Sequence, residues 1–398
     1  MDDQMDIGAR IRRARGKLFT QKMLADRAGV SVSIVQKLER GLRKTASIST
    51  LQKIAKALDL PIEELVGGRK SMPAAASGVV DLRRALTPVD DLLDVELLDG
   101  EPLTMRDARR SVEYLWGSYW AGRYELLAEM LPSSLAQLRA TYHSVAPADA
   151  HEAAGLLARG YQAAADTLVH LGQPDAGWLG VREAITAARN SEDMLLYAAM
   201  RISVSWQLLV QGRYEESKNV AIRASRDVKP GKKSSDSQLA AYGLLNVTAA
   251  TAAARDQDST HTDDLIEESI ETATRLGYER TDHQSTFGPA KVAMIAVDCA
   301  VVQEQYSTAL SVAARLRHDT TLPLATRARH LADVALAQLK LGRSADALNT
   351  VLAIESMAPD WLQYQTLPRQ VVDELLEQEL SLSTPLRSLA MRLGVSRN

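Results

Sequence analysis

The sequence predicts an all-α protein in which a compact five-helix N-terminal unit precedes an α-solenoid of helix pairs. Three observations support this fold class. Apolar residues recur at helical spacing through the 398 residues, and no convincing alternating strand pattern occurs. Pro and Gly, at 13 and 22 residues, are sparse. Short turns between helices of similar length recur through the longer C-terminal part of the chain, which is typical of stacked helix pairs.

The N-terminal unit contains two short helices joined by a tight turn. These helices are expected over residues 20–28 and 31–40. Thr20 and Ser31 stand where each helix needs a hydroxyl N-cap, and Gly29 supplies the backbone conformation that the turn requires. Two helices joined in this way allow the second to enter the major groove of DNA.

Three further elements complete this unit. A first helix is expected over Ile7–Lys17, and a fourth over Ser47–Leu58, where apolar residues recur at helical spacing. Pro61 begins a last short helical turn, which ends near a Gly-Gly pair at residues 67–68.

The chain divides into two domains of opposite charge. We place the first domain at residues 1–68, a breaker-rich linker with a possible helix at 69–100, and the helical repeats at 101–398. Residues 1–70 hold 15 Lys and Arg against 8 Asp and Glu, whereas the rest of the chain holds 32 against 42. A basic N-terminal domain on an acidic body is suited to presenting one end to phosphates.

Composition excludes several classes of protein. The chain is 46% hydrophobic and 24% charged, as in folded soluble proteins. No run of 18 apolar residues and no signal peptide occur, so we expect a cytoplasmic protein that makes no contact with membranes. Cys299, the single cysteine, lies in an apolar helical run and is expected to be a small buried hydrophobe.

Turns mark the repeats of the body. Two near-copies, at residues 119–125 and 209–215, place an aromatic or apolar residue before Gly-Arg-Tyr-Glu. The interval between the third and fourth recurring turns is longer and spans two units, with Arg255–Gln257 between them. We favour a solenoid of helix pairs, although repeats longer than a standard tetratricopeptide unit also fit a non-repetitive helical bundle. The recurring turns are Ala121–Tyr124, Leu171–Pro174, Gln211–Tyr214, Gln303–Tyr306 and Leu341–Ser344.

The N-terminal domain resembles the xenobiotic-response-element (Cro/C1-type) helix-turn-helix family. The connection from Arg15 to Thr20 is about one residue shorter than is usual in that family, which leaves the end of the first helix less well defined. The matching positions are Arg10-Ile11, Arg15, Thr20-Gln21, Leu24-Ala25, Gly29-Val30-Ser31, Leu38-Glu39-Arg40-Gly41 and the helix Leu51–Leu58.

This resemblance implies double-stranded DNA as a partner and assigns roles to individual residues. Val32, Ser33, Gln36 and Lys37 fall at the positions that face base edges, where Gln and Lys pair with purines and Val contacts a thymine methyl. Arg15 and Glu39 resemble an internal ion pair of the family. A homodimer on an inverted-repeat operator is expected, because one small domain engages few phosphates. The residues expected to contact phosphates are Gln21, Arg40, Arg43 and Lys44.

The body resembles the tetratricopeptide-like domains of actinobacterial regulators and is distantly similar to the RRNPP peptide-sensing regulators. This implies a transcriptional regulator, of a type used in quorum sensing, whose groove binds a peptide or a small molecule. Residues 286–292 are similar to a recurrent signature of the actinobacterial group, with a helix expected to begin at Gly288-Pro289. The candidate ligand-binding residues are Arg201, Trp206, Gln207, Tyr242, Asn246, His283, Phe287 and Lys291.

Two alternatives remain open. The solenoid is also suited to binding a partner protein, which makes the chain an adaptor or a repressor with no diffusible ligand. A hidden hydrolase is the other alternative, but the sequence contains no catalytic constellation, no metal-ligand spacing and no cofactor motif. We therefore expect no enzymatic activity, no metal and no cofactor.

Overall fold

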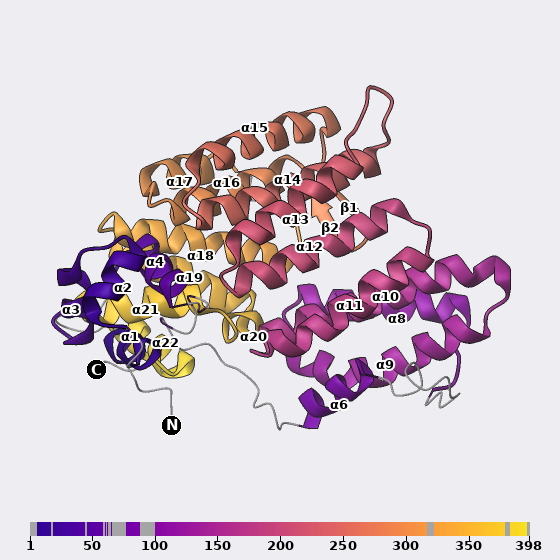
Figure 1. Cartoon of the computed structure of the whole chain (residues 1–398), viewed down its shortest axis with the longest axis horizontal. Coiled ribbons are helices and arrows are strands. Elements are labelled where there is room, and N and C mark those ends of the chain that lie inside the picture. The colour runs from indigo at the N-terminus through magenta and orange to yellow at the C-terminus, as the bar shows by residue number, and fades with distance from the viewer. Residues whose placement is uncertain are drawn as a thin grey trace.

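The computed structural model describes residues 6–16, 19–43, 46–58, 60, 62, 65, 77–87, 100–316, 322–378 and 383–395. The described chain is almost entirely helical, as the sequence predicts, with a small N-terminal domain (the head) followed by a solenoid of helix pairs (the body) (Figure 1). The helices of the head are α1 (Ile7–Arg15), α2 (Gln21–Ala28), α3 (Val32–Glu39) and α4 (Ile48–Ala57).

Local chemistry explains the boundaries of the head helices. Thr20 Oγ1 accepts a hydrogen bond from the Met23 amide (3.1 Å), and Ser31 Oγ accepts one from Ile34 (3.3 Å), so both predicted N-caps are confirmed. Gly29 ends α2 in the left-handed region, at φ 63°. Helix α1 ends at Arg15, two residues before the predicted end, and Gly16 at φ 53° follows it.

A compact core holds the head helices together. Ile11, Leu24, Val35, Leu38 and Leu51 are fully buried. Of the predicted fifth helical turn, only Ile62 and Leu65 belong to the described residues, and Leu65 is buried in this core.

Helix α6 (Ser77–Ala85) begins the part of the chain that packs on the body. Gly78 lies against Ala128, and Arg83 donates to Gln173 Oε1 (2.8 Å). The remainder of the predicted helical segment after Pro88 lies outside the described residues up to residue 99.

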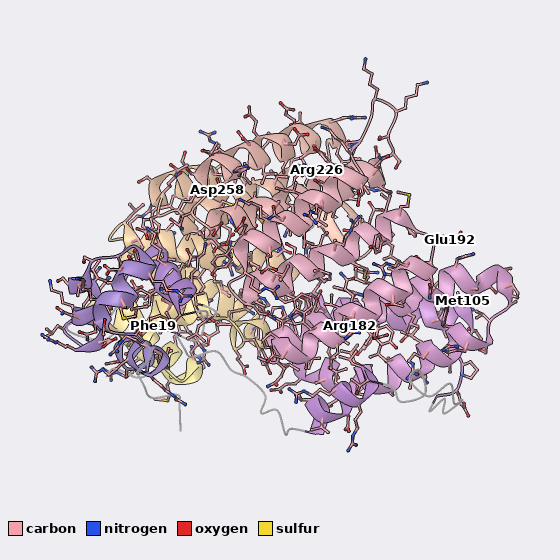
Figure 2. All side chains as sticks on the ribbon, in the orientation of Figure 1. Phe19, Met105, Arg182, Glu192, Arg226 and Asp258 are labelled. Atoms are coloured by element: carbon pink, nitrogen blue, oxygen red, sulfur yellow. The ribbon has the colours of Figure 1, made fainter. Side chains whose placement is uncertain are left out.

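The body consists of antiparallel helix pairs whose first helices form an inner layer and whose second helices form an outer layer. Lys218 and Asp258 join neighbouring pairs across the outer layer (2.7 Å), and this bond lowers the pKa of Asp258 to about 2. Asp258 is labelled in the upper part of the body in Figure 2. The pairs are α8 (Met105–Trp120) with α9 (Tyr124–Ser144), α10 (Ala150–His170) with α11 (Pro174–Asn190), α12 (Met194–Val210) with α13 (Tyr214–Asp227), α14 (Asp236–Arg255) with α15 (Ser259–Leu276), α16 (Pro289–Val302) with α17 (Tyr306–Ala313), and α18 (Leu324–Lys340) with α19 (Ser344–Met357). The chain continues through η1 (Pro147–Asp149) before α10, and through α20 (Pro359–Leu362), α21 (Thr366–Gln378) and α22 (Thr384–Leu393) at the C-terminal end.

Each recurring turn predicted from the sequence joins the two helices of one pair. The second or third residue of each turn adopts a left-handed conformation, which Gly enters without steric cost. Two turns use other residues at this position, Gln257 at φ 62° and Glu304 at φ 63°. The glycines at the equivalent position are Gly122, Gly172, Gly212 and Gly342.

The solenoid curves until its C-terminal part meets its first helix pair. Trp361 lies directly against Gly122, where a Cβ would stand 2.6 Å from the Trp361 Cβ. The Tyr364 hydroxyl donates to Glu125 Oε1 (2.7 Å), and the Tyr364 and Tyr124 rings meet edge to face with centroids 5.4 Å apart. The inner layer therefore encloses a curved interior.

A two-stranded hairpin interrupts the helices of the body. Strands β1 (Arg280–Asp282) and β2 (Ser285–Phe287) pair in antiparallel register, although the sequence showed no strand pattern. Three-residue strands are too short for alternation to be recognised. The turn between them contacts the first helix pair, because Trp120 Nε1 donates to the Gln284 carbonyl (3.0 Å).

Candidate nucleic-acid interface and ligand groove

An ion pair and its hydrogen bonds link helices α1, α2 and α3 of the head. Arg15 donates through Nε and Nη2 to the two Glu39 carboxylate oxygens (2.7 and 3.0 Å), as the sequence predicts. Gln21 Nε2 also donates to Glu39 Oε2 (2.7 Å). Burial alone raises the pKa of Glu39, but these hydrogen bonds hold it below its ordinary value. The carboxylate therefore positions α1, α2 and α3 relative to one another.

The predicted reading surface lies on one side of α3. Ser33 and Lys37 are exposed, whereas Gln36 is half-buried and Val32 packs partly against the head core. Arg40 and Arg43, which follow α3, are also exposed. One amide hydrogen of Gln21 is engaged by Glu39, which leaves its second hydrogen for a phosphate. Lys44 lies outside the described residues.

Helix α4 attaches the head to the body at two helix-pair turns. The Ser49 amide donates to Glu304 Oε1 (3.2 Å), and the Ser49 hydroxyl donates to Gln257 Oε1 (3.1 Å). Lys56 Nζ forms an ion pair with Asp256 Oδ1 (2.5 Å). Helix α3 lies on the outer side of the head in the same view (Figure 1).

The inner layer of the body lines a groove with two adjoining compartments. The head-side compartment has a volume of about 390 Å³, and Gln52 and Ile62 of the head form part of its wall. The aromatic compartment has a volume of about 300 Å³. Volumes of this size accommodate small molecules or a few peptide side chains. The residues that line both compartments are Tyr119, Trp120, Trp206, Leu209, Thr251, Lys291, Ile295 and Thr326.

Charged side chains cross the floor of the head-side compartment. Asp298 is 5% exposed and accepts hydrogen bonds from Arg255 (2.9 and 3.0 Å) and Arg329 (2.7 Å). Burial alone raises the pKa of Asp298, but the two guanidinium groups bring it well below its usual range. Asp333, which also pairs with Arg329 (3.2 Å), has its pKa raised to about 7 by burial. Burial lowers the pKa of His330 to about 4, so its ring is neutral at pH 7.

Aromatic rings form the opposite part of the groove wall. Tyr119 meets Trp116 and Trp120 edge to face, with centroids 5.0 and 5.1 Å apart. His170 stacks on Tyr124 with centroids 4.1 Å apart and an interplanar angle of 10°. Such a wall favours flat apolar or cationic ligand groups.

The structure places two of the predicted ligand-binding residues in the groove. Trp206 and Lys291 line both compartments. Helix α16 begins at Pro289, as predicted, but the Glu279 carboxylate already accepts the Ala290 amide at its N-terminus (2.6 Å). Burial lowers the pKa of Lys291.

The other predicted ligand-binding residues lie elsewhere, in packing between helices. Gln207 is completely buried over Gly177 of α11, and Phe287 is completely buried over Gly243 of α14. Asn246 is 3% exposed, and its Nδ2 has no hydrogen-bond partner among the described residues.

The remaining three predicted ligand-binding residues make polar contacts away from the cavities. Tyr242 donates to Glu268 Oε1 (3.0 Å), and Arg201 pairs with Asp227 (2.6 Å). His283 lies in the turn of the hairpin, 3.7 Å from Asp193. These contacts give each of the three side chains a polar partner within the protein, so none of them requires a bound ligand.

Sequence reasoning missed most of the groove. Tyr119, Trp120, His170 and Asp166 come from the first two helix pairs, which had been treated only as repeats. In α8, α10, α12 and α14 the groove residues include aromatic or polar side chains in the last two turns of the helix, whereas α16 and α18 contribute Lys291, Thr326 and Arg329 from their first two turns.

Of three comparisons with known proteins, one matches a family over part of the chain. A family model described as helix-turn-helix matches residues 11–65. No curated protein matches the chain. A crystal structure of Bacillus thuringiensis PlcR in complex with the peptide PapR7 and DNA is similar at 16% identity and a TM-score of 0.31, covering 68% of this chain and 95% of that one.

No helix in the described ranges combines the length and apolar character needed to cross a membrane. No cluster of His, Cys, Asp and Glu suited to a metal ion occurs in the same part of the chain.

The match over residues 11–65, the confirmed caps and the Arg15–Glu39 pair together identify the head as a helix-turn-helix DNA-binding domain of the Cro/C1 type.

Proposed function

We propose that this protein is a sequence-specific transcriptional regulator whose groove binds a signal molecule that tunes operator binding by the head. The observation that carries the proposal is the position of the head, because Gln52 and Ile62 form part of the groove wall. A ligand that fills the head-side compartment contacts these residues or displaces them. Groove occupancy and head position are then linked by contact.

The docking turns support a functional role for this contact. Gln257 and Glu304 occupy the left-handed position that Gly occupies in the turns at 122, 172, 212 and 342. A non-Gly residue in this conformation costs about 1 kcal/mol or more. These two side chains are the ones that bind Ser49 of the head. The body therefore tolerates strain at the two turns where the head attaches.

The working form in this proposal is a homodimer. One head contacts few phosphates, so two heads spaced about one helical turn of DNA apart, roughly 34 Å, are needed for tight binding. A ligand that favours a different curvature of the body, or a different position of the head, changes the fit of both heads to their half-sites. The ligand is a peptide or a small molecule.

Capture of genomic DNA fragments by the purified protein at near-physiological salt tests the DNA-binding part of this proposal. We expect one inverted-repeat sequence with half-sites about a turn apart. Recovery of sequence-independent fragments only, lost as salt rises, would contradict it.

The coupling between head and body has its own test. Gln257→Gly and Glu304→Gly together remove the docking side chains and relieve the turn strain. We expect the melting temperature to stay the same or rise, while operator affinity changes several-fold. If the double variant bound the operator with the affinity of the unaltered protein, docking of the head on the body would not influence DNA binding. That result would contradict the proposed coupling. Gly342→Ala, at the equivalent position of the turn between α18 and α19, changes turn conformation without removing a docking side chain and serves as the control.

A further inference from the structure

The aromatic compartment contains two buried acceptor atoms without partners. Asp166 on α10 is 6% exposed, and its Oδ2 accepts a hydrogen bond from Ser203 (3.1 Å), but its Oδ1 has no partner among the described residues. Gln162 lies one turn earlier and donates to Ser203 (2.9 Å), while its Oε1 also lacks a partner. Both residues line the compartment. Buried acceptors of this kind are costly unless a donor reaches them.

Backbone carbonyls engage the indole N–H groups of two surrounding tryptophans, so these two side chains offer ring surface rather than donors. Trp116 Nε1 donates to the Arg159 carbonyl (3.1 Å), and Trp120 Nε1 donates to the Gln284 carbonyl (3.0 Å). Their rings, with those of Tyr119 and Trp206, line the compartment. A cation near such rings is stabilised by their negative faces.

Lys291 is the other charged group of this compartment. It also lines the head-side compartment, and the carboxylates that act on it are those of Asp298 and Glu279. Burial without a full partner raises the pKa of Asp166 to about 7, so a carboxylate is held here at a cost to the folded protein. A side chain that costs stability in this way is typical of a binding site.

We propose that the aromatic compartment binds an organic ammonium group, with Asp166 and Gln162 accepting its N–H donors and the Trp120 and Trp206 rings covering its apolar part. The inference rests on the proposed function, because it names the chemical class of the signal molecule. A compartment of about 300 Å³ takes an amine with a small aromatic or alkyl body.

Binding of 2-phenylethylammonium to the full chain, measured by calorimetry and by tryptophan fluorescence, tests this assignment. 2-Phenylethanol is the matched neutral probe, since it differs in the ammonium group alone. We expect saturable binding of the amine that is about tenfold or more tighter than that of the alcohol. Equal affinity for both probes, or no saturable binding of the amine, would overturn the assignment.

Two variants locate the bound amine. Asp166→Asn is expected to lose about tenfold or more in amine affinity while its affinity for the alcohol is unchanged. Asp346→Asn removes a carboxylate from an exposed pair with Arg343 on α19 and is expected to bind like the unaltered protein. A melting temperature for Asp166→Asn at or above that of the unaltered protein shows that the variant folds. Unchanged amine affinity in this folded variant would refute the site.

The outcome is independent of the DNA experiments. Recovery of an operator without amine binding would support the proposed regulatory function and contradict the proposed ammonium site. Amine binding without recovery of any operator would support the ammonium site and contradict the proposed regulatory function.

Discussion

The charged floor of the groove gives the most direct test of how the body is held together. Asp298 accepts three charge-assisted hydrogen bonds, at 2.9, 3.0 and 2.7 Å, from Arg255 and Arg329. Its side chain is 7% exposed, so little water replaces a lost partner. Asp298→Asn keeps the shape but leaves two guanidinium groups facing an amide. Removing one member of a buried ion network costs about 3–5 kcal/mol.

The loss is measurable as a shift in thermal unfolding. At about 2 °C for each kcal/mol in a domain of this size, we expect the melting temperature of Asp298→Asn to fall by roughly 6–10 °C. The control is Asp346→Asn, in a pair whose side chains are 54% and 47% exposed, which should change it by about 2 °C or less. Equal shifts in the two variants would refute the reasoning that burial makes the Asp298 network strong.

Two further predictions concern single carboxylates. Arg15→Ala leaves the buried Glu39 carboxylate without its bidentate partner and should destabilise the head by about 3 kcal/mol, seen as faster amide exchange in α1, α2 and α3. Because the folded-state pKa of Glu39 is depressed, this contribution is present above its unfolded pKa of about 4 and is lost as pH falls through the lower folded-state pKa. A deficit of the variant that did not shrink at all on acidification would argue against it. Asp166→Asn should stabilise the ligand-free protein at pH 8, by at most about 4 kcal/mol, and have no effect at pH 4. The sign follows because burial raises the folded-state pKa of Asp166 to about 7, so stability present below its unfolded pKa is lost as pH rises toward 7. The other titratable groups nearby are Lys291, Tyr119, Tyr124 and His170. A pH-independent effect would contradict the assignment.

Local chemistry made the head predictable. The N-caps and the left-handed Gly29 depend on residues close in sequence, so the sequence identifies them. The helix-pair turns were found for the same reason, including the two in which Gln257 and Glu304 replace Gly. The Arg15–Glu39 pair joins residues 24 positions apart and was expected only from the resemblance to the Cro/C1-type family.

The groove was predicted poorly because its wall depends on distant contacts. Trp206 and Gln207 are adjacent in sequence, but successive side chains on a helix point about 100° apart, so one lines the groove and the other packs over Gly177. Curvature of the solenoid brings Tyr364 to Glu125, and no local pattern in the sequence encodes that closure. Buried acceptors such as Asp166 were recognisable only after their partners had been placed.

The central claim, that α3 reads base sequence, is tested by the affinity of Gln36→Ala for the captured operator and for a scrambled duplex of equal length. We expect a loss of about 1–3 kcal/mol on the operator and almost none on the scrambled duplex. Arg43→Ala, at a predicted phosphate contact, should weaken both duplexes about equally. If Gln36→Ala weakened binding to both duplexes by the same factor, α3 would not be the element that reads the sequence.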